Sequence, residues 1–132
     1  MITIDTSGIV AVVNADDPDH RRTVDALVSV PGPYLIPVSI LSEVAYLLER
    51  AILPSVFDTF LRELETHVYT LHFSLDDLPR VRRLIHRYSD LPLGFADASV
   101  IACAERHGGR VLTLDRRHFG VVEGEGTISL LP

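Results

Sequence analysis

The chain has 132 residues, with 47% hydrophobic residues, 23% charged residues and a formal net charge of −6. This composition is typical of a folded globular domain and excludes a low-complexity tail. The acidic balance also excludes a protein that holds nucleic acid by bulk positive charge, so any such contact must be local.

Short apolar runs alternate with helical periodicity along the chain. The expected strands cover residues 2–5, 34–37, 68–73, 110–115 and 127–131. The expected helices cover residues 7–15, 19–30, 39–51, 55–66, 77–88 and 94–107. This alternation predicts an α/β fold with a mainly parallel sheet. No linker or repeat divides the chain, so we expect residues 1–132 to form one domain.

Cysteine, histidine and hydropathy patterns bound the compartment and the kinds of site. Cys103 has no second cysteine to pair with and lies in an apolar helical stretch, so we expect a small buried side chain. The six histidines are scattered without zinc-ligand spacing, and we expect them to be surface or structural residues. No stretch approaches the roughly 18 apolar residues that span a bilayer. A cytoplasmic protein without membrane attachment is expected.

Two of the expected strands end on an aspartate. The stretches ITID (2–5) and LTLD (112–115) share the order apolar, Thr, apolar, Asp. Ligands of an open parallel sheet bind beyond the carboxyl ends of the strands, so Asp5 and Asp115 could lie side by side at such a site. Each aspartate could instead cap the helix that follows it. The presence of both favours a site.

Two further carboxylates border apolar helices. Glu43 lies beside the apolar stripe of its helix and could point toward the end of the sheet, although an early-helix Glu is also favoured by the helix dipole. Asp97 lies near the start of a helix of small and apolar residues, too far inside to be its N-cap, so the functional interpretation is preferred. Four converging carboxylates repel each other unless a hard divalent cation compensates their charge.

The order and spacing of these acids resemble those of a known family. Asp5, Glu43, Asp97 and Asp115 resemble the acidic quartet of PIN-domain ribonucleases. The segments IDTSG, LPLGFADA and LTLDRRHFG and the Glu43 helix are similar to that family's motifs, and the similarity covers nearly the whole chain. The short chain also resembles the VapC toxins of bacterial toxin–antitoxin pairs.

This resemblance implies a fold, an activity and partners. The fold would be a three-layer α/β/α sandwich around a five-stranded, mainly parallel sheet. The activity would be endonucleolytic cleavage of RNA with Mg²⁺ or Mn²⁺, inhibiting translation. The partners would be a cognate antitoxin that blocks the site and a second copy of the chain in a homodimer.

Metal-assisted hydrolysis assigns roles to the quartet. Asp5 and Asp97 are the first choices for direct metal ligands. Asp115 and Glu43 are expected to bind the metal or to orient metal-bound water, and either could accept the proton of that water. Asp90 is an additional acid upstream of Asp97 that could support the metal or begin a turn.

Residues that flank the acids are candidates for supporting roles. The hydroxyls of Thr6, Ser7 and Thr113 could orient a carboxylate or touch a phosphate, or could instead satisfy the local backbone. Arg116 and Arg117 supply positive charge beside Asp115, and the planar guanidinium suits phosphate.

Other functions weaken or stay open on sequence grounds. A phosphoacceptor receiver domain uses a lysine, and the chain has none. A phosphatase of the haloacid-dehalogenase type needs a second aspartate at the position of Ser7. A PIN-like binding or scaffold module without catalysis remains the alternative, because a fold alone does not secure activity.

Overall fold

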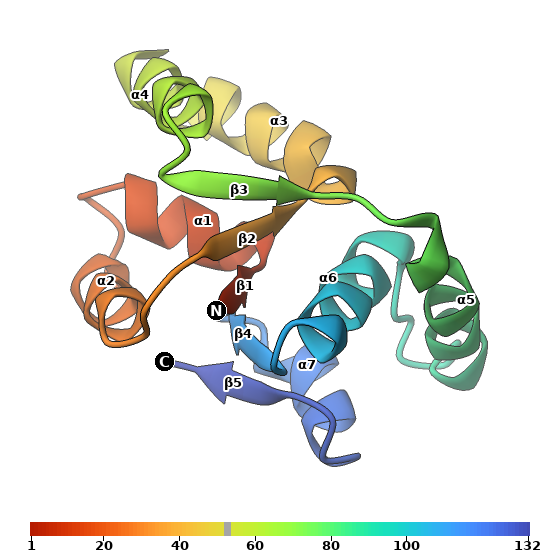
Figure 1. The fold of residues 1–132 in the computed structure, drawn as a ribbon. Helices are drawn as coiled ribbons and strands as arrows, with labels where there is room; N and C mark the ends of the chain where they lie inside the picture. The colour runs from red at the N-terminus through yellow and green to blue at the C-terminus, as the bar shows by residue number, and fades with distance from the viewer. Residues whose placement is uncertain (52–53) are drawn as a thin grey trace.

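The computed structural model describes residues 1–51 and 54–132, in which strands and helices alternate (Figure 1). The elements are β1 (Ile2–Ile4), α1 (Thr6–Val13), α2 (His20–Val28), β2 (Tyr34–Pro37), α3 (Leu41–Ala51), α4 (Pro54–Glu65), β3 (Tyr69–His72), α5 (Leu78–Arg87), α6 (Phe95–Arg106), β4 (Arg110–Leu112), α7 (Arg116–Glu123) and β5 (Ser129–Leu131). Single 3₁₀ turns, Val38–Ile40 and Leu75–Asp77, lead into α3 and α5. Among the described residues, no helix is long and apolar enough to cross a membrane.

The strands form one parallel sheet in the order β3-β2-β1-β4-β5. Helices α1 to α4 cover one face and α5 to α7 lie on the other, which confirms the expected three-layer α/β/α sandwich (Figure 1). The chain runs outward from β1 through β2 to β3 and then returns to the other side of β1 with β4. The sheet therefore has a topological switch point between β1 and β4, where open α/β sheets bind ligands.

The core explains why the central elements are almost continuously apolar. All three residues of β1 are buried, because both faces of a central parallel strand are covered by helices. Helix α6 packs against β1, β2, β4 and α5, and it buries six residues, among them Ala98, Ile101 and Cys103. The expectation that Cys103 is a small buried side chain is confirmed.

Two expectations at the C-terminal end were wrong. Helix α7 was not predicted, because it has only eight residues and Gly120 interrupts its short periodic pattern. The strand expected over 110–115 ends at Leu112, and only the backbone N–H of Thr113 continues the ladder, to the carbonyl oxygen of Leu131 at 2.9 Å. The loop that follows places Asp115 at the start of α7 instead of at a strand end.

The register between β1 and β4 also differs from the alignment of ITID with LTLD. Ile4 pairs with Leu112, so Thr113 follows β4 at the level where Asp5 follows β1. Asp115 lies two residues further along the chain. The matching sequence patterns therefore bring Asp5 next to a hydroxyl group, with the second aspartate beyond it.

Candidate metal centre in an acidic cleft

A cleft of about 290 Å³ opens at the carboxyl ends of β1 and β4. Its lining residues are Asp5, Thr6, Ser7, Val10, Asp17, Glu43, Leu47, Asp97, Leu114 and Asp115. The quartet proposed from the sequence thus lies around one cleft, each acid at or near the start of a different helix: α1, α3, α6 or α7. Helix N-termini carry partial positive charge, which favours carboxylates and other anions there.

Asp5 is the buried centre of the cleft. It is the N-cap of α1, and its side chain accepts from the backbone N–H of Ser7 at 3.4 Å. The hydroxyls of Ser7 and Thr113 each donate to Oδ2 of Asp5 at 2.9 Å. Burial nevertheless raises the pKa of this carboxyl above its ordinary value, because these hydrogen bonds compensate only part of the lost hydration. Within residues 1–51 and 54–132, no ion pair joins Asp5 to an arginine or a histidine.

The same two hydroxyls fix the loop after β4. Oγ of Ser7 accepts from the backbone N–H of Leu114 at 2.9 Å, and Oγ1 of Thr113 accepts from that of Asp115 at 3.0 Å. The close approach depends on Gly8, because a Cβ there would lie 2.6 Å from the carbonyl oxygen of Leu112. Both uses that the sequence allowed for these hydroxyls therefore occur together: they orient a carboxylate and satisfy the backbone.

Asp97 is the second carboxyl of the cleft whose pKa is raised by its surroundings. Burial, followed by the charge of Asp5, raises its pKa from 3.8 to about 6, and Asp115 adds to the rise. The N–H of Gly94, the N-cap of α6, partly opposes this shift. Gly94 is the N-cap of α6 and Asp97 is the third residue of the helix, so the expectation that Asp97 lies too far inside to be the N-cap is confirmed.

Glu43 lies in the first turn of α3 and is exposed at the edge of the cleft. Partial burial, followed by the charge of Asp5, raises the pKa of its carboxyl. The buried hydroxyl of Thr6 faces it closely enough to oppose that rise. Within residues 1–51 and 54–132, however, Oγ1 of Thr6 has no partner with full hydrogen-bond geometry. Thr6 thus offers the cleft a polar atom that has no strong partner.

Asp115 differs from the other three acids because a histidine stabilises its charge. Its Oδ1 accepts from the backbone N–H of His118 at 3.0 Å, and its Oδ2 pairs with Nδ1 of the same residue at 2.8 Å. Burial raises the pKa of Asp115, but these contacts outweigh it and the net pKa is lowered. This pair was not predicted from the sequence. An N-cap aspartate followed three residues later by histidine is the signal that could have found it.

Residues outside the acidic quartet differ from the sequence expectations in whether they line the cleft. Arg116 donates to the carbonyl oxygen of Pro132, and neither it nor the exposed Arg117 lines the cleft. Asp90 is exposed and also lies outside it. Asp17, between α1 and α2, does line the cleft and was missed. No local pattern separates it from the other acids of the same loop.

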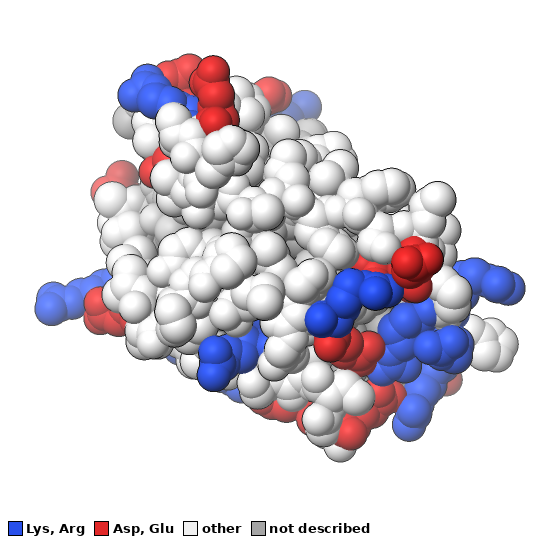
Figure 2. Space-filling view, viewed as in Figure 1, with Lys and Arg blue, Asp and Glu red and all other residues white. Residues whose placement is uncertain are grey.

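Three of the four arginines of α5, Arg80, Arg83 and Arg87, border a separate, larger cleft of about 790 Å³. Arg80 pairs with Glu105 and Glu125 at 2.8 Å, and Arg87 also pairs with Glu125 at 2.8 Å. Charges of both signs gather on this part of the surface, at the lower right of Figure 2. These ion pairs neutralise much of the positive charge that α5 would otherwise present to an anion.

The acidic cleft fits a hard divalent cation by its donor set. Its four carboxylates offer only oxygen ligands, which Mg²⁺ and Mn²⁺ prefer. Burial and mutual repulsion raise the pKa of Asp5, Glu43 and Asp97, so a cation would stabilise the ionised form of each. Thr6 adds a further oxygen.

Two of the histidines, which no ligand spacing in the sequence marks, lie close to Cys103 in the structure. Within the described parts of the chain, one group of three is tight enough to hold a metal ion: ligand atoms of His72, Cys103 and His107 lie within 4.8 Å of one another. Cys103 lies in α6, His107 is the C-cap of that helix, and His72 comes from β3. The group is formed by tertiary contact, so its third member has no sequence spacing to reveal it.

The parallel sheet and the four carboxylates at its switch point define a class of α/β protein with a candidate binding site for hard cations. Within that class, the chain belongs to the PIN-domain family, because residues 2–124 match the model of the PIN domain. The family resemblance drawn from the four acids is confirmed by this match.

Named relatives and solved structures agree with the family. The chain is 29% identical over 133 residues to Ribonuclease VapC26 of Mycobacterium tuberculosis, covering 98% of both proteins. VapC20 of the same organism, a sarcin-ricin loop cleaving toxin, superposes with a TM-score of 0.78 at 20% identity over 92% of this chain and 95% of that one. VapBC2 from Rickettsia felis, bound to a promoter DNA fragment, gives 0.69 at 18% identity over 98% and 97%. These structural matches establish the shared fold.

Proposed function

We propose that this protein is a cytoplasmic, metal-dependent endoribonuclease, in which residues 1–132 form one domain that hydrolyses RNA phosphodiester bonds. The observation that carries the proposal is the gathering of four carboxylates around one cleft of about 290 Å³. The ribonuclease named as a relative, aligned along nearly the whole chain, supports the same activity. The raised pKa values of three of these acids support a divalent cation, Mg²⁺ or Mn²⁺, as the missing compensation.

Asp5 and Asp97 are assigned as the primary metal ligands. A bound Mg²⁺ or Mn²⁺ would lower the pKa of a water and neutralise charge on the leaving oxygen. Ser7 and Thr113 both donate to Oδ2 of Asp5 and so fix the orientation of the carboxylate that would hold the cation. Glu43, exposed and with a raised pKa, accepts the proton from the attacking water. Asp115, held by His118, orients that water.

We assign the protein as the toxin of a toxin–antitoxin pair that inhibits translation. VapC20 is named as a toxin, and VapBC2 was crystallised with promoter DNA. A cognate antitoxin is therefore the expected partner. The chain's own positive charge near RNA would come from Arg117, which is exposed beside Asp115, while Arg116 is engaged with the C-terminus.

A homodimer is the second proposed assembly. Six large apolar side chains are exposed near the end of β3 and the start of α6: Val38, Leu71, Phe73, Leu75, Leu78 and Phe95. Four of them line an apolar cleft of about 190 Å³. We call this set the apolar patch and assign it to the contact between two copies, because exposed apolar patches of monomers mark interaction sites.

The test of the activity is cleavage of total RNA by the purified protein freed of antitoxin. We expect cuts with Mg²⁺ or Mn²⁺ and none with EDTA. Asp97→Asn should reduce the rate by roughly a hundredfold or more, since it removes a ligand charge. The matched control, Asp90→Asn, changes an exposed acid outside the cleft and should cut like the wild type. Equal cutting by Asp97→Asn would contradict the proposal, and metal binding without any cutting would favour the non-catalytic module.

A further inference from the structure

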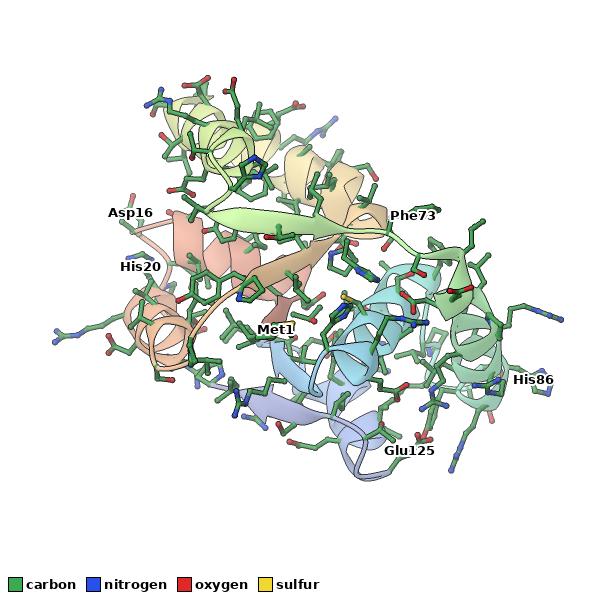
Figure 3. The ribbon with its side chains drawn as sticks, in the orientation of Figure 1. Met1, Asp16, His20, Phe73, His86 and Glu125 are labelled. Atoms are coloured by element: carbon green, nitrogen blue, oxygen red, sulfur yellow. The ribbon has the colours of Figure 1, made fainter. Side chains whose placement is uncertain are left out.

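A second cluster of metal-ligating side chains lies apart from the acidic cleft. His72 ends β3, Cys103 lies in the last turns of α6, and His107, four residues further on, is the C-cap of that helix. Cys103 is fully buried and both histidines are half-buried. One ligand atom from each side chain lies within 4.8 Å of the others. Figure 3 labels Phe73, the neighbour of His72, where β3 ends above α6.

Existing hydrogen bonds orient both imidazole rings. Nε2 of His72 donates to Oδ2 of Asp77 at 2.9 Å, and Nδ1 of His107 donates to the carbonyl oxygen of Cys103 at 2.8 Å. Both acceptors lack protons, so these two nitrogens carry the ring protons. The other nitrogens, Nδ1 of His72 and Nε2 of His107, keep lone pairs. Metal-bound histidines usually donate their second N–H to a carboxylate or carbonyl in this way.

Asp77 acts as the positioning group for His72. Its Oδ1 accepts from Nε of Arg106 at 2.6 Å, so both carboxylate oxygens are already engaged. Burial alone would raise the pKa of Asp77, but His72 and Arg106 outweigh it and the pKa is lowered. The carboxylate therefore stays charged at neutral pH and holds the His72 ring in one orientation.

We propose that His72, Cys103 and His107 bind a thiophilic divalent cation of the Zn²⁺ class, with water in the fourth position. One thiol and two imidazoles form the mixed sulfur and nitrogen donor set that Zn²⁺ prefers, and Mg²⁺ does not. Bonds of about 2.0–2.3 Å to a tetrahedral Zn²⁺ bring ligand atoms to roughly 3.3–3.8 Å of one another. Metal binding would therefore draw the three ligand atoms closer together than the 4.8 Å within which they now lie.

Binding exchanges one proton for one metal ion. As the sulfur–metal bond forms, the Cys103 thiol releases its proton to solvent. Burial raises the pKa of this thiol to about 11, more than the hydroxyl of Thr3 lowers it. The bound ion would join the end of β3 to the helix that carries Asp97. This site is independent of the proposed ribonuclease activity.

Titration with Co²⁺, a spectroscopic substitute for Zn²⁺, tests the site on the purified full chain. Saturating Mg²⁺ is present throughout to fill oxygen-ligand sites such as the acidic cleft. We expect one equivalent of Co²⁺ to produce a thiolate-to-cobalt charge-transfer band, and Zn²⁺ to abolish the band by displacing Co²⁺. Absence of the band in the wild type would overturn the proposal.

Variants identify the ligands. Cys103→Ser keeps the side-chain size and should lose the band and at least tenfold in Zn²⁺ affinity. Asp97→Asn, in the acidic cleft, and His86→Asn, an exposed histidine on α5, should leave both unchanged. If Cys103→Ser does not fold by circular dichroism, the half-buried His72→Asn decides: a tenfold loss of affinity supports the site. Zn²⁺ affinity within twofold of wild type in the folded variant overturns it.

Discussion

At the scale of single residues, capping and metal binding are compatible roles for the same aspartate. Asp5 accepts from the N–H of Ser7 at the start of α1, and Asp115 accepts from the N–H of His118 at the start of α7. Each also lines the cleft. An N-cap hydrogen bond fixes the carboxylate orientation that a metal site needs. Asparagine keeps the capping oxygen and removes the charge, so Asp→Asn variants separate the two roles.

The charge of Asp97 makes a residue-scale prediction about pH. Its pKa is 3.8 in the unfolded chain and about 6 in the folded one, so between these values the folded state binds more protons. The contribution of this group should therefore lower the unfolding free energy of the metal-free protein as pH rises from about 4 to about 6. Asp5 and Glu43, also raised, act in the same direction.

Urea titrations of wild type and Asp97→Asn in EDTA, at several pH values across that window, measure this contribution. The variant should gain stability relative to wild type as pH rises, because its amide does not ionise. Saturating Mg²⁺ should reduce the gain, since the cation stabilises the ionised carboxylate. A difference between the two proteins that stays constant with pH would contradict the raised pKa of Asp97.

At the scale of elements, the position of α1 on the sheet depends on one missing methyl group. A Cβ at Gly8 would lie 2.6 Å from the carbonyl oxygen of Leu112, so Gly8→Ala must push α1 away from β4. We expect a loss of about 1–3 kcal/mol in unfolding free energy. The shift would also separate Asp5 from Thr113.

Gly120→Ala is the matched control for this substitution. Gly120 also lies inside a helix, α7, but a Cβ there meets nothing within 4 Å. The same change should stabilise the protein by about 0.4–1 kcal/mol, because alanine restricts the unfolded chain. Chemical denaturation of both variants gives the comparison. Equal effects at the two glycines would show that helix propensity, and not the contact with β4, governs Gly8.

The elements also separate what the sequence predicts from what it does not. The apolar runs identified all five strands, and β2 was placed at its observed bounds. Register was not predictable, because the pairing of Ile4 with Leu112 depends on how two distant strands pack. Four acids of the cleft could be predicted because each departs from an apolar neighbourhood, whereas Asp17 lies among other acids in a polar loop and was missed. The cluster of Cys103 and His107 with His72 was not recognised, because His72 comes from strand β3 and has no sequence spacing to the other two.

At the scale of the whole molecule, the topology concentrates negative charge at the switch point between β1 and β4, where the order of the strands reverses. The net charge of −6 gives the protein no general attraction for RNA, and the arginines of α5 are partly neutralised by Glu105 and Glu125. Substrate binding must then rest on the metal ion and on a few local contacts.

The apolar patch supplies the prediction for the proposed homodimer. Phe73 is 74% exposed at the end of β3, and Leu75 beside it is 66% exposed (Figure 3). If two copies bury the patch, Phe73→Arg places a charge in an apolar interface and should convert a dimer to a monomer. Light scattering coupled to gel filtration measures the mass. Val28→Arg, at a residue 65% exposed on α2, is the control and should remain dimeric.

The alternative occupant of the patch is the antitoxin, and the same variant distinguishes it. A Phe73→Arg protein that stays dimeric but no longer co-elutes with co-expressed antitoxin would assign the patch to that partner. A protein that is monomeric and still binds antitoxin would assign it to self-association. The second result is the one we expect, because the patch lies beside the acidic cleft and not over it: no residue lines both.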